Sequence, residues 1–244
     1  MLIEQTLQSL TDLNLLGMKQ ALQNQRDHPK THDLSFDERL GLLVDYEKAY
    51  RQGKKIDRLQ KAARLRHSSA CLEAIDYEPT RGLKRDVIAQ LASCTWIKDS
   101  FNLFITGPTG IGKSWIACAL AHQACRMGLS TYYIRVPKLW QDLRLAHSDG
   151  SYARMLSKLA KIDLLILDDW GLERLTADHR RDLLDIIEDR HQLKSTLITS
   201  QVPPASWHEI INDPTLADAI LDRLSSRQFT LELTGESMRK MKKI

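Results

Sequence analysis

The chain has 244 residues, of which 43% are hydrophobic and 27% are charged, as is typical of a globular protein with one domain or two unequal ones. Its longest aliphatic run, Leu164–Leu167, is far shorter than the roughly 18 residues that suggest a membrane span, and no secretory signal opens the sequence. We therefore expect a cytoplasmic protein without a membrane partner. The formal net charge of +4 is small, but the bases are concentrated in a few segments, which points to a polyanionic partner.

Residues 1–78 are predicted to form a helical domain that binds DNA or a protein partner. Apolar residues recur at helical spacing over residues 3–22 and predict a helix that ends near Pro29. Ser35 and Glu38 fit a capping box, in which each side chain binds the backbone N–H of the other residue. A second helix is therefore predicted to begin directly after Ser35.

A strongly basic run follows within this predicted domain. Residues 48–66 hold eight Lys or Arg residues and a single acid, Asp57. If the run is helical, five of the bases fall largely on one face: Arg51, Lys54, Lys55, Arg58 and Lys61. Such a stripe suits a phosphate backbone, and no base-reading motif accompanies it. We expect contacts to double-stranded DNA without strong sequence preference.

From residue 79 to residue 244, short β-rich runs alternate with helical segments, and residues 78–82 read as a linker or turn. This alternation predicts a doubly wound α/β domain with a mostly parallel five-stranded sheet. The predicted strands are 101–106, 132–136, 164–168, 196–200 and 229–233. The predicted helices lie near 113–127, 138–147, 151–160, 177–193 and 215–225.

A phosphate-binding motif lies between the first predicted strand and the helix that follows it. The motif G-x-x-x-x-G-K-[ST] is matched without deviation by Gly107, Pro108, Thr109, Gly110, Ile111, Gly112, Lys113 and Ser114. The glycines let backbone N–H groups turn toward an anion, and the helix N-terminus adds partial positive charge. Lys113 suits the β- and γ-phosphates of ATP, and the Ser114 hydroxyl is a ligand for Mg²⁺.

A second nucleotide signature closes the third predicted strand, where a buried apolar run ends in two carboxylates. Ligands of parallel α/β sheets bind at the carboxyl ends of the strands. Asp168 is placed to hold Mg²⁺, and Asp169 to orient or deprotonate the attacking water. Together with the loop, this pair predicts a Mg²⁺-dependent ATP hydrolase.

With these motifs in this order, the whole chain resembles the AAA+ ATPases, and more closely the IstB-like transposition helpers and their relatives, the DnaC-type helicase loaders. Besides the two nucleotide motifs, the resemblance rests on stretches near the fourth and fifth strands and at the C-terminus: 197–201, 222–224 and 235–239. It implies a P-loop fold with a reduced or absent lid, and a homo-oligomer bridged by ATP. It also implies a protein that assists a transposase on DNA.

The resemblance further implies roles for five polar residues. Ser200 or Gln201 stands where the family keeps a polar group near the γ-phosphate. Arg223 or Arg227 stands where it places an arginine finger that reaches the ATP of a neighbouring subunit, and these two remain unseparated. Arg239 matches the sensor-2 arginine.

A second basic set lies between the second and third strands, where the family's relatives line a nucleic-acid channel. It includes Lys138, Arg144, Arg154, Lys158 and Lys161. The sequence itself shows only the charge, and the resemblance implies the channel.

Two alternatives remain open beside transposase assistance on duplex DNA. A helicase loader would use its N-terminal helices on a replicative helicase and prefer single strands. A nucleotide-gated binding switch would show little turnover, because Asp169 is shorter than the Glu that many AAA+ members have at this position.

Overall fold

The computed structural model describes residues 2–28, 31 and 33–238, except the side chain of Pro79. By its internal contacts the chain divides into two compact units, Met1–Arg58 and Leu59–Ile244. The functional boundary that we predicted between residues 78 and 79 stays a prediction. In the part of the chain that is described, no helix has the length and apolar character needed to cross a bilayer.

The first unit is helical, as the sequence predicts. It contains α1 (Leu2–Asp12), α2 (Leu16–Asp27) and the part of α3 (Phe36–Ala63) up to Arg58. Instead of one helix over residues 3–22 there are two, because the chain turns at Asn14, whose φ of 56° lies in the left-handed region.

Close packing joins α2 to α3 within this unit. A Cβ atom at Gly17 would lie 2.7 Å from the Cβ of Tyr50, so only glycine lets the two helices approach this closely. The buried Glu47 carboxylate accepts a hydrogen bond from the backbone N–H of Met18 (3.0 Å). The capping box is confirmed, since Glu38 Oε2 accepts from the Ser35 N–H (2.8 Å) and Ser35 Oγ accepts from the Glu38 N–H (3.3 Å).

The second unit is built on a five-stranded sheet in the order β2-β3-β4-β1-β5, with every neighbouring pair parallel. The strands are β1 (Asn102–Thr106), β2 (Thr131–Arg135), β3 (Leu164–Trp170), β4 (Ser195–Ser200) and β5 (Gln228–Glu232). All five lie within two residues of the predicted ranges. The predicted doubly wound parallel sheet is therefore confirmed.

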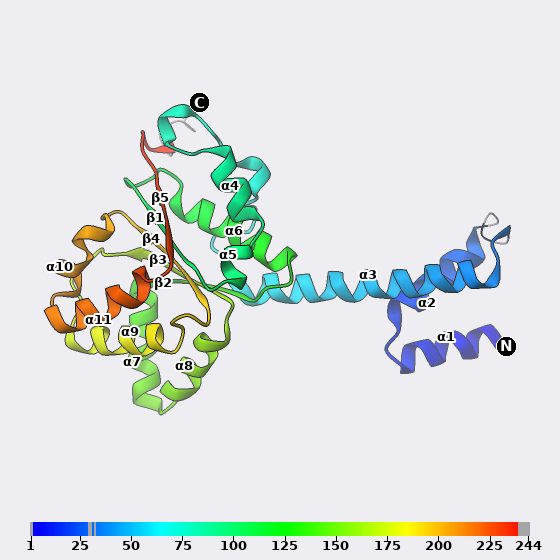
Figure 1. The fold of residues 1–244 in the computed structure, drawn as a ribbon. Coiled ribbons are helices and arrows are strands. Elements are labelled where there is room, and N and C mark those ends of the chain that lie inside the picture. Colours follow the sequence, from blue (N-terminus) through cyan, green and yellow to red (C-terminus); the bar gives the residue numbers. More distant parts are fainter. Residues whose placement is uncertain (1, 29–30, 32, 239–244) are drawn as a thin grey trace. The chain divides into compact units, whose positions relative to one another are not determined.

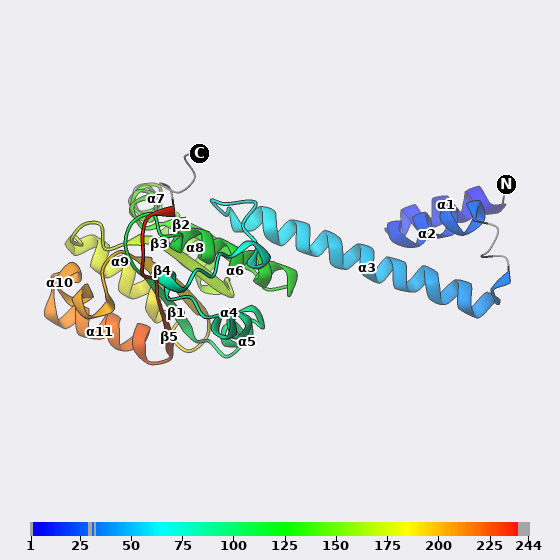
Figure 2. The ribbon, with the colours of Figure 1, turned by 90° about the horizontal axis from the view of Figure 1, so that it is seen from above.

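Helices cover both faces of the sheet (Figures 1 and 2). They are α4 (Arg85–Ala92), α5 (Thr95–Lys98), α6 (Lys113–Arg126), α7 (Val136–Asp149), α8 (Tyr152–Lys161), α9 (Ala177–Glu188), α10 (Trp207–Ile211) and α11 (Pro214–Ser225). Short 3₁₀ turns lie at Leu72–Ala74, Pro79–Arg81 and Pro204–Ser206. The sequence did not predict α4, α5 and α10, which are too short for a clear helical period.

Two apolar cores lie on opposite faces of the sheet because successive strand residues point to opposite sides. In β1, Leu103 and Ile105 pack into the core that contains α4, α5 and α6, whereas Phe104 packs into the core that contains α7, α9 and α11. Figure 1 shows α4–α6 on one side of the strands and α9–α11 on the other. Both faces are buried, which explains why the strands read as continuous apolar runs rather than as alternating ones.

Candidate functional site

The phosphate-binding motif forms the loop between β1 and α6. Gly107, Gly110 and Gly112 have φ angles of 141°, 84° and 98°, a region that disfavours side chains. A Cβ atom at Gly107 would also collide with the carbonyl group of Leu233. The loop therefore needs glycine at this position for backbone angle and for space.

Lys113 is the first residue of α6, and its side chain is nearly buried. Its Nζ donates hydrogen bonds to the carbonyls of Gly107 (2.6 Å) and Pro108 (2.8 Å), so the ammonium folds back over its own loop. Phosphate oxygens are stronger, charged acceptors than these carbonyls. The lysine is thus held at the loop by contacts that an anionic ligand can replace.

Two segments that are distant in sequence donate hydrogen bonds to the loop. The Arg81 guanidinium is buried and donates to the carbonyl of Ile111 (2.9 Å), and the backbone N–H of Met238 donates to the carbonyl of Gly110 (3.1 Å). Arg81 belongs to the stretch that the sequence indicated only as a linker or turn. A single arginine in such a stretch gives no periodic signal, so its role in supporting the loop could not be predicted.

Asp168 lies at the centre of a cluster of hydroxyl groups. Its carboxylate is fully buried, and Oδ1 accepts hydrogen bonds from Ser114 Oγ (2.8 Å) and Thr199 Oγ1 (2.5 Å). Oδ2 accepts from the Tyr133 hydroxyl. Burial and the bond to Asp168 raise the pKa of Tyr133, so this hydroxyl stays protonated and donates.

The structure thus brings together Ser114 and Asp168, the two residues that we predicted to hold Mg²⁺. All the groups in the cluster are oxygen donors, the type that Mg²⁺ prefers, so the residues present fit this ion. Tyr133 was not predicted, because an aromatic residue inside a β-strand is usually a core residue.

Asp169, the next residue, has entirely different surroundings. The register between β3 and β4 is interrupted between Leu167 and Trp170, and Asp169 has a φ of 62°. This irregularity re-aims the side chain, as β-bulges beside functional sites often do. The carboxylate is a quarter exposed and forms an ion pair with Arg135 at the end of β2 (2.9 Å). No sequence signal indicated Arg135.

Ser200 and Gln201, the alternatives for the polar residue near the γ-phosphate, differ in their contacts. Ser200 is buried, and its Oγ donates to the carbonyl of Trp170 and accepts from the N–H of Val202, both at 3.0 Å. Gln201 is exposed, and its Oε1 accepts a hydrogen bond from Thr109 Oγ1 of the phosphate-binding loop (2.6 Å). Of the two side chains, Gln201 is therefore the one that contacts the loop.

The candidate finger arginines also differ. The Arg223 guanidinium is ion-paired with Glu188 and donates to the carbonyl of Ala219 (2.8 Å). Arg227 is exposed, and its guanidinium carbon lies 6.0 Å from the ring centre of Phe101. Arg239, the predicted sensor-2 residue, lies outside the described residues, as does the end of the chain where a lid would lie.

The predicted DNA-binding residues lie on exposed helix surfaces. On α3 they are Arg51, Lys54, Lys55, Arg58 and Lys61, the last of which belongs to the second unit. Arg51 is ion-paired with Glu47 (2.6 Å). The second set lies on α7 and α8 and comprises Lys138, Arg144, Arg154, Lys158 and Lys161. Lys138 is ion-paired with Asp142 (2.8 Å).

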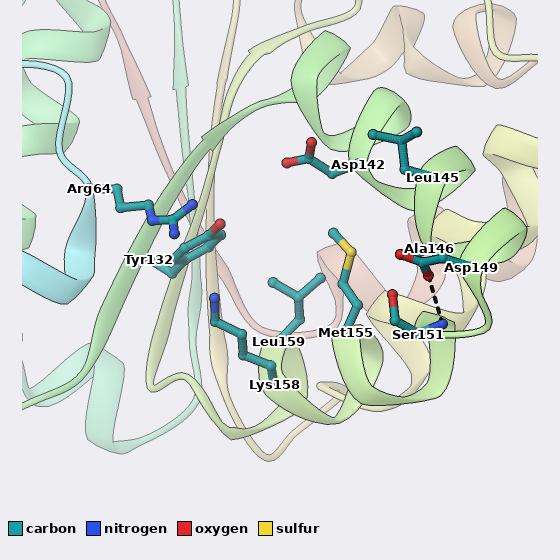
Figure 3. Close-up of a pocket in the computed structure, with 10 residues that line it drawn as sticks. All are labelled: Arg64, Tyr132, Asp142, Leu145, Ala146, Asp149, Ser151, Met155, Lys158 and Leu159. Carbon is teal, nitrogen blue, oxygen red and sulfur yellow. Dashed lines mark hydrogen bonds between the residues drawn. The ribbon is translucent and has the colours of Figure 1, made fainter.

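A cavity of about 270 Å³ lies beside β2, between α7 and α8 (Figure 3). Arg64 and Lys158 flank the Tyr132 ring at 5.9 and 4.6 Å from its centre, and Met155 and Leu159 add apolar surface. None of its lining residues comes from the phosphate-binding loop, so this cavity is distinct from the nucleotide site.

Comparison with known proteins gives a family match over almost the whole chain. The model of a family described as IstB-like ATP binding protein matches residues 8–244. An ATP-binding protein of insertion sequence IS1162 from Pseudomonas fluorescens is 52% identical over 84% of this chain and 89% of its own length. An insertion sequence ATP-binding protein from Sinorhizobium fredii is 47% identical over 98% of both chains.

Solved structures are similar in fold at low sequence identity. The crystal structure of the DnaC helicase loader has a TM-score of 0.55 at 19% identity and covers 68% of this chain and 97% of its own. The replication initiator DnaA bound to AMPPCP and single-stranded DNA has a TM-score of 0.58 at 16% identity, over 70% of this chain and 51% of its own. At these identities the likeness shows the fold alone, and it confirms the predicted P-loop class.

Proposed function

Because the chain belongs to the IstB-like ATP-binding protein family, as its motifs predicted, we propose that it is an AAA+ ATPase that assembles on duplex DNA and assists a transposase. The observation that carries the enzymatic part is the cluster of Lys113, Ser114 and Asp168 at the end of β1 and β3. This cluster combines a phosphate-binding loop with a buried carboxylate that fits Mg²⁺.

In this proposal the loop binds the phosphates of ATP. Backbone N–H groups of residues 109–114, at the N-terminus of α6, are available to the anion. Lys113 exchanges the carbonyls of Gly107 and Pro108 for phosphate oxygens, which places its charge on the β- and γ-phosphates. Ser114 and Asp168 hold Mg²⁺, which neutralises developing charge on the phosphates when it is bound.

Asp169 and Gln201 complete the proposed site on the side of the attacking water. Asp169 orients the water or accepts its proton once its carboxylate leaves Arg135. Gln201 contacts Thr109 in the loop, so a change in the loop on phosphate binding reaches the end of β4 directly. We therefore assign the role of polar sensor to Gln201 rather than to Ser200.

We assign the arginine finger to Arg227. Arg223 is anchored to Glu188 and Ala219 within its own chain, whereas Arg227 is exposed and available to a second copy. An arginine that acts in a neighbouring subunit makes hydrolysis depend on assembly. ATP would then join like subunits into a homo-oligomer.

The names of the relatives support the transposition role. Proteins at 47–52% identity are named as ATP-binding proteins of insertion sequences, and the match to one of them covers 98% of both chains. The likeness to the DnaC loader is one of fold alone and gives the helicase-loader alternative less support. The exposed bases on α3, α7 and α8 suit the backbone of DNA.

One observation favours a second candidate, a nucleotide-gated switch with little turnover. The Asp169 carboxylate is ion-paired with Arg135, and it must leave this partner before it can contact the attacking water. Phosphate release with saturating duplex DNA separates the two functions. Stimulation by DNA supports the ATPase, and a rate equal to the DNA-free rate supports the switch.

The direct test of the nucleotide site is Lys113→Ala. Loss of a charge-assisted contact to phosphate should weaken ATP binding by about 10- to 100-fold, measured with a fluorescent ATP analogue. Lys161→Ala, which removes an exposed lysine at the end of α8, is the matched control and should bind like the parent. Equal binding by the parent and by Lys113→Ala would contradict the proposed site.

A further inference from the structure

The short segment after α3 carries a basic residue to the buried carboxylate of the nucleotide site. The helix ends at Ala63, and Arg64 turns the chain with a φ of 53°. Two residues later, Nη1 of Arg66 lies 3.9 Å from Asp168 Oδ2. The Arg66 side chain is 42% exposed, while that of Asp168 is 0% exposed, so the arginine approaches the carboxylate from the solvent side.

Tyr133 strengthens this link. Its hydroxyl donates to Asp168 Oδ2, the same oxygen that Arg66 approaches. A hydrogen bond with the Tyr133 hydroxyl raises the pKa of Arg66, consistent with a guanidinium held at this point. The two oxygens of Asp168 therefore have different partners. Oδ1 accepts hydrogen bonds from Ser114 and Thr199. Oδ2 accepts a hydrogen bond from Tyr133 and forms an ion pair with Arg66.

We propose that Arg66 competes with Mg²⁺ for the Asp168 carboxylate and so sets how tightly the site holds the ion. The proposal rests on the proposed function, since it takes Asp168 as a residue that holds Mg²⁺. A guanidinium beside the carboxylate lowers the negative potential that a divalent cation meets there. Removing that charge leaves the Tyr133 hydroxyl as the partner of Oδ2 and strengthens metal binding.

Arg66 also lies close in sequence to the helix with the exposed bases. It follows α3, the helix that carries the exposed bases proposed to bind DNA, after only two intervening residues.

The test uses Mn²⁺ as a spectroscopic substitute for Mg²⁺. Binding of Mn²⁺ to the full-length protein with a non-hydrolysable ATP analogue is measured by electron paramagnetic resonance, which requires no turnover. Arg66→Gln should lower the dissociation constant for Mn²⁺ by about two- to fivefold, the size expected for a partly exposed ion pair. Arg66→Lys keeps the charge and should remain closer to the parent.

Arg64→Gln is the matched control, because Arg64 lies in the same junction but faces Tyr132 rather than Asp168. It should leave the Mn²⁺ affinity unchanged. An unchanged affinity in Arg66→Gln, or an equal change in Arg64→Gln, overturns the proposal.

Binding of the analogue at saturating Mn²⁺ shows which idea fails. If the parent does not bind the analogue, the proposed function falls and this inference with it. If the parent and all variants bind it equally, but Arg66→Gln holds Mn²⁺ like the parent, only the role of Arg66 is wrong.

Discussion

Two consecutive aspartates illustrate how closely chemistry depends on local backbone in this protein. Asp168 is fully buried among hydroxyl donors, whereas Asp169 is turned by a left-handed backbone toward Arg135. A non-glycine residue in this region costs of order 1 kcal/mol or more. The left-handed backbone at Asp169 turns its carboxylate away from that of Asp168. The buried Asp168 carboxylate therefore suits a metal ion, and the partly exposed Asp169 carboxylate suits an attacking water molecule.

The glycines of the chain give a paired prediction on stability. Gly107→Ala should destabilise the protein by about 1–3 kcal/mol, because its φ of 141° is strained for alanine and its Cβ would strike the Leu233 carbonyl. Gly41→Ala, in the interior of α3 with open space around the new Cβ, should stabilise it by about 0.5–1 kcal/mol. Urea denaturation followed by circular dichroism measures both changes.

If both alanine variants lose stability, the result contradicts the open space that the structure shows around a Cβ atom at Gly41. If Gly107→Ala does not change stability, the result contradicts the close contact between Leu233 and the phosphate-binding loop.

The residues of the site differ in how far the sequence could predict them. Lys113, Ser114 and Asp168 belong to motifs whose spacing carries the chemistry, and the structure brings them together. Tyr133, Arg135 and Arg66 reach the site only because β2 lies next to β3 and the segment after α3 returns to Asp168. Such neighbours depend on topology, which local patterns do not contain.

Among the elements, long periodic segments and apolar strands were predictable, and short helices were not. All five strands follow from apolar runs, and the boundary of α3 follows from the capping box at Ser35. The break between α1 and α2 at Asn14 was missed, because apolar residues on both sides of it keep a helical spacing. In this case the hydrophobic period continues through a turn that the backbone makes.

The basic face of α3 gives a prediction at the level of a single helix. Lys55→Gln removes one phosphate contact, so the slope of log affinity against log salt for duplex DNA should become about 0.9 shallower. Arg26→Gln removes one exposed base from α2 and should leave the slope unchanged. Affinity is measured by fluorescence anisotropy over a range of salt concentrations.

Equal slopes for the parent and for Lys55→Gln would remove α3 from the DNA interface. An equal loss in Arg26→Gln would indicate a general charge effect instead of a defined stripe.

At the level of the assembled molecule, mixtures of two variants test which of the two candidate arginines acts in a neighbouring subunit. Lys113→Ala and Arg227→Ala should each be inactive alone, but a mixture should regain part of the ATPase rate. Some interfaces in the mixture join an intact loop to an intact arginine of the neighbouring subunit. Arg223→Ala is the control, because this arginine is anchored to Glu188 and should not be needed in a neighbour. This variant should be active alone, so mixing it with Lys113→Ala should give no recovery above its own rate.

Recovery with Arg223→Ala and none with Arg227→Ala would reverse the assignment of the finger. No recovery in either mixture would show that neither arginine acts between subunits.

The proposed mechanism requires that ATP at the phosphate-binding loop joins subunits and that the joined subunits bind duplex DNA. Electron microscopy and sedimentation of the protein with duplex DNA and a non-hydrolysable ATP analogue test both requirements together. We predict large assemblies with the analogue, and none without nucleotide or with Lys113→Ala. Equal assembly on DNA in nucleotide-free buffer would contradict the mechanism.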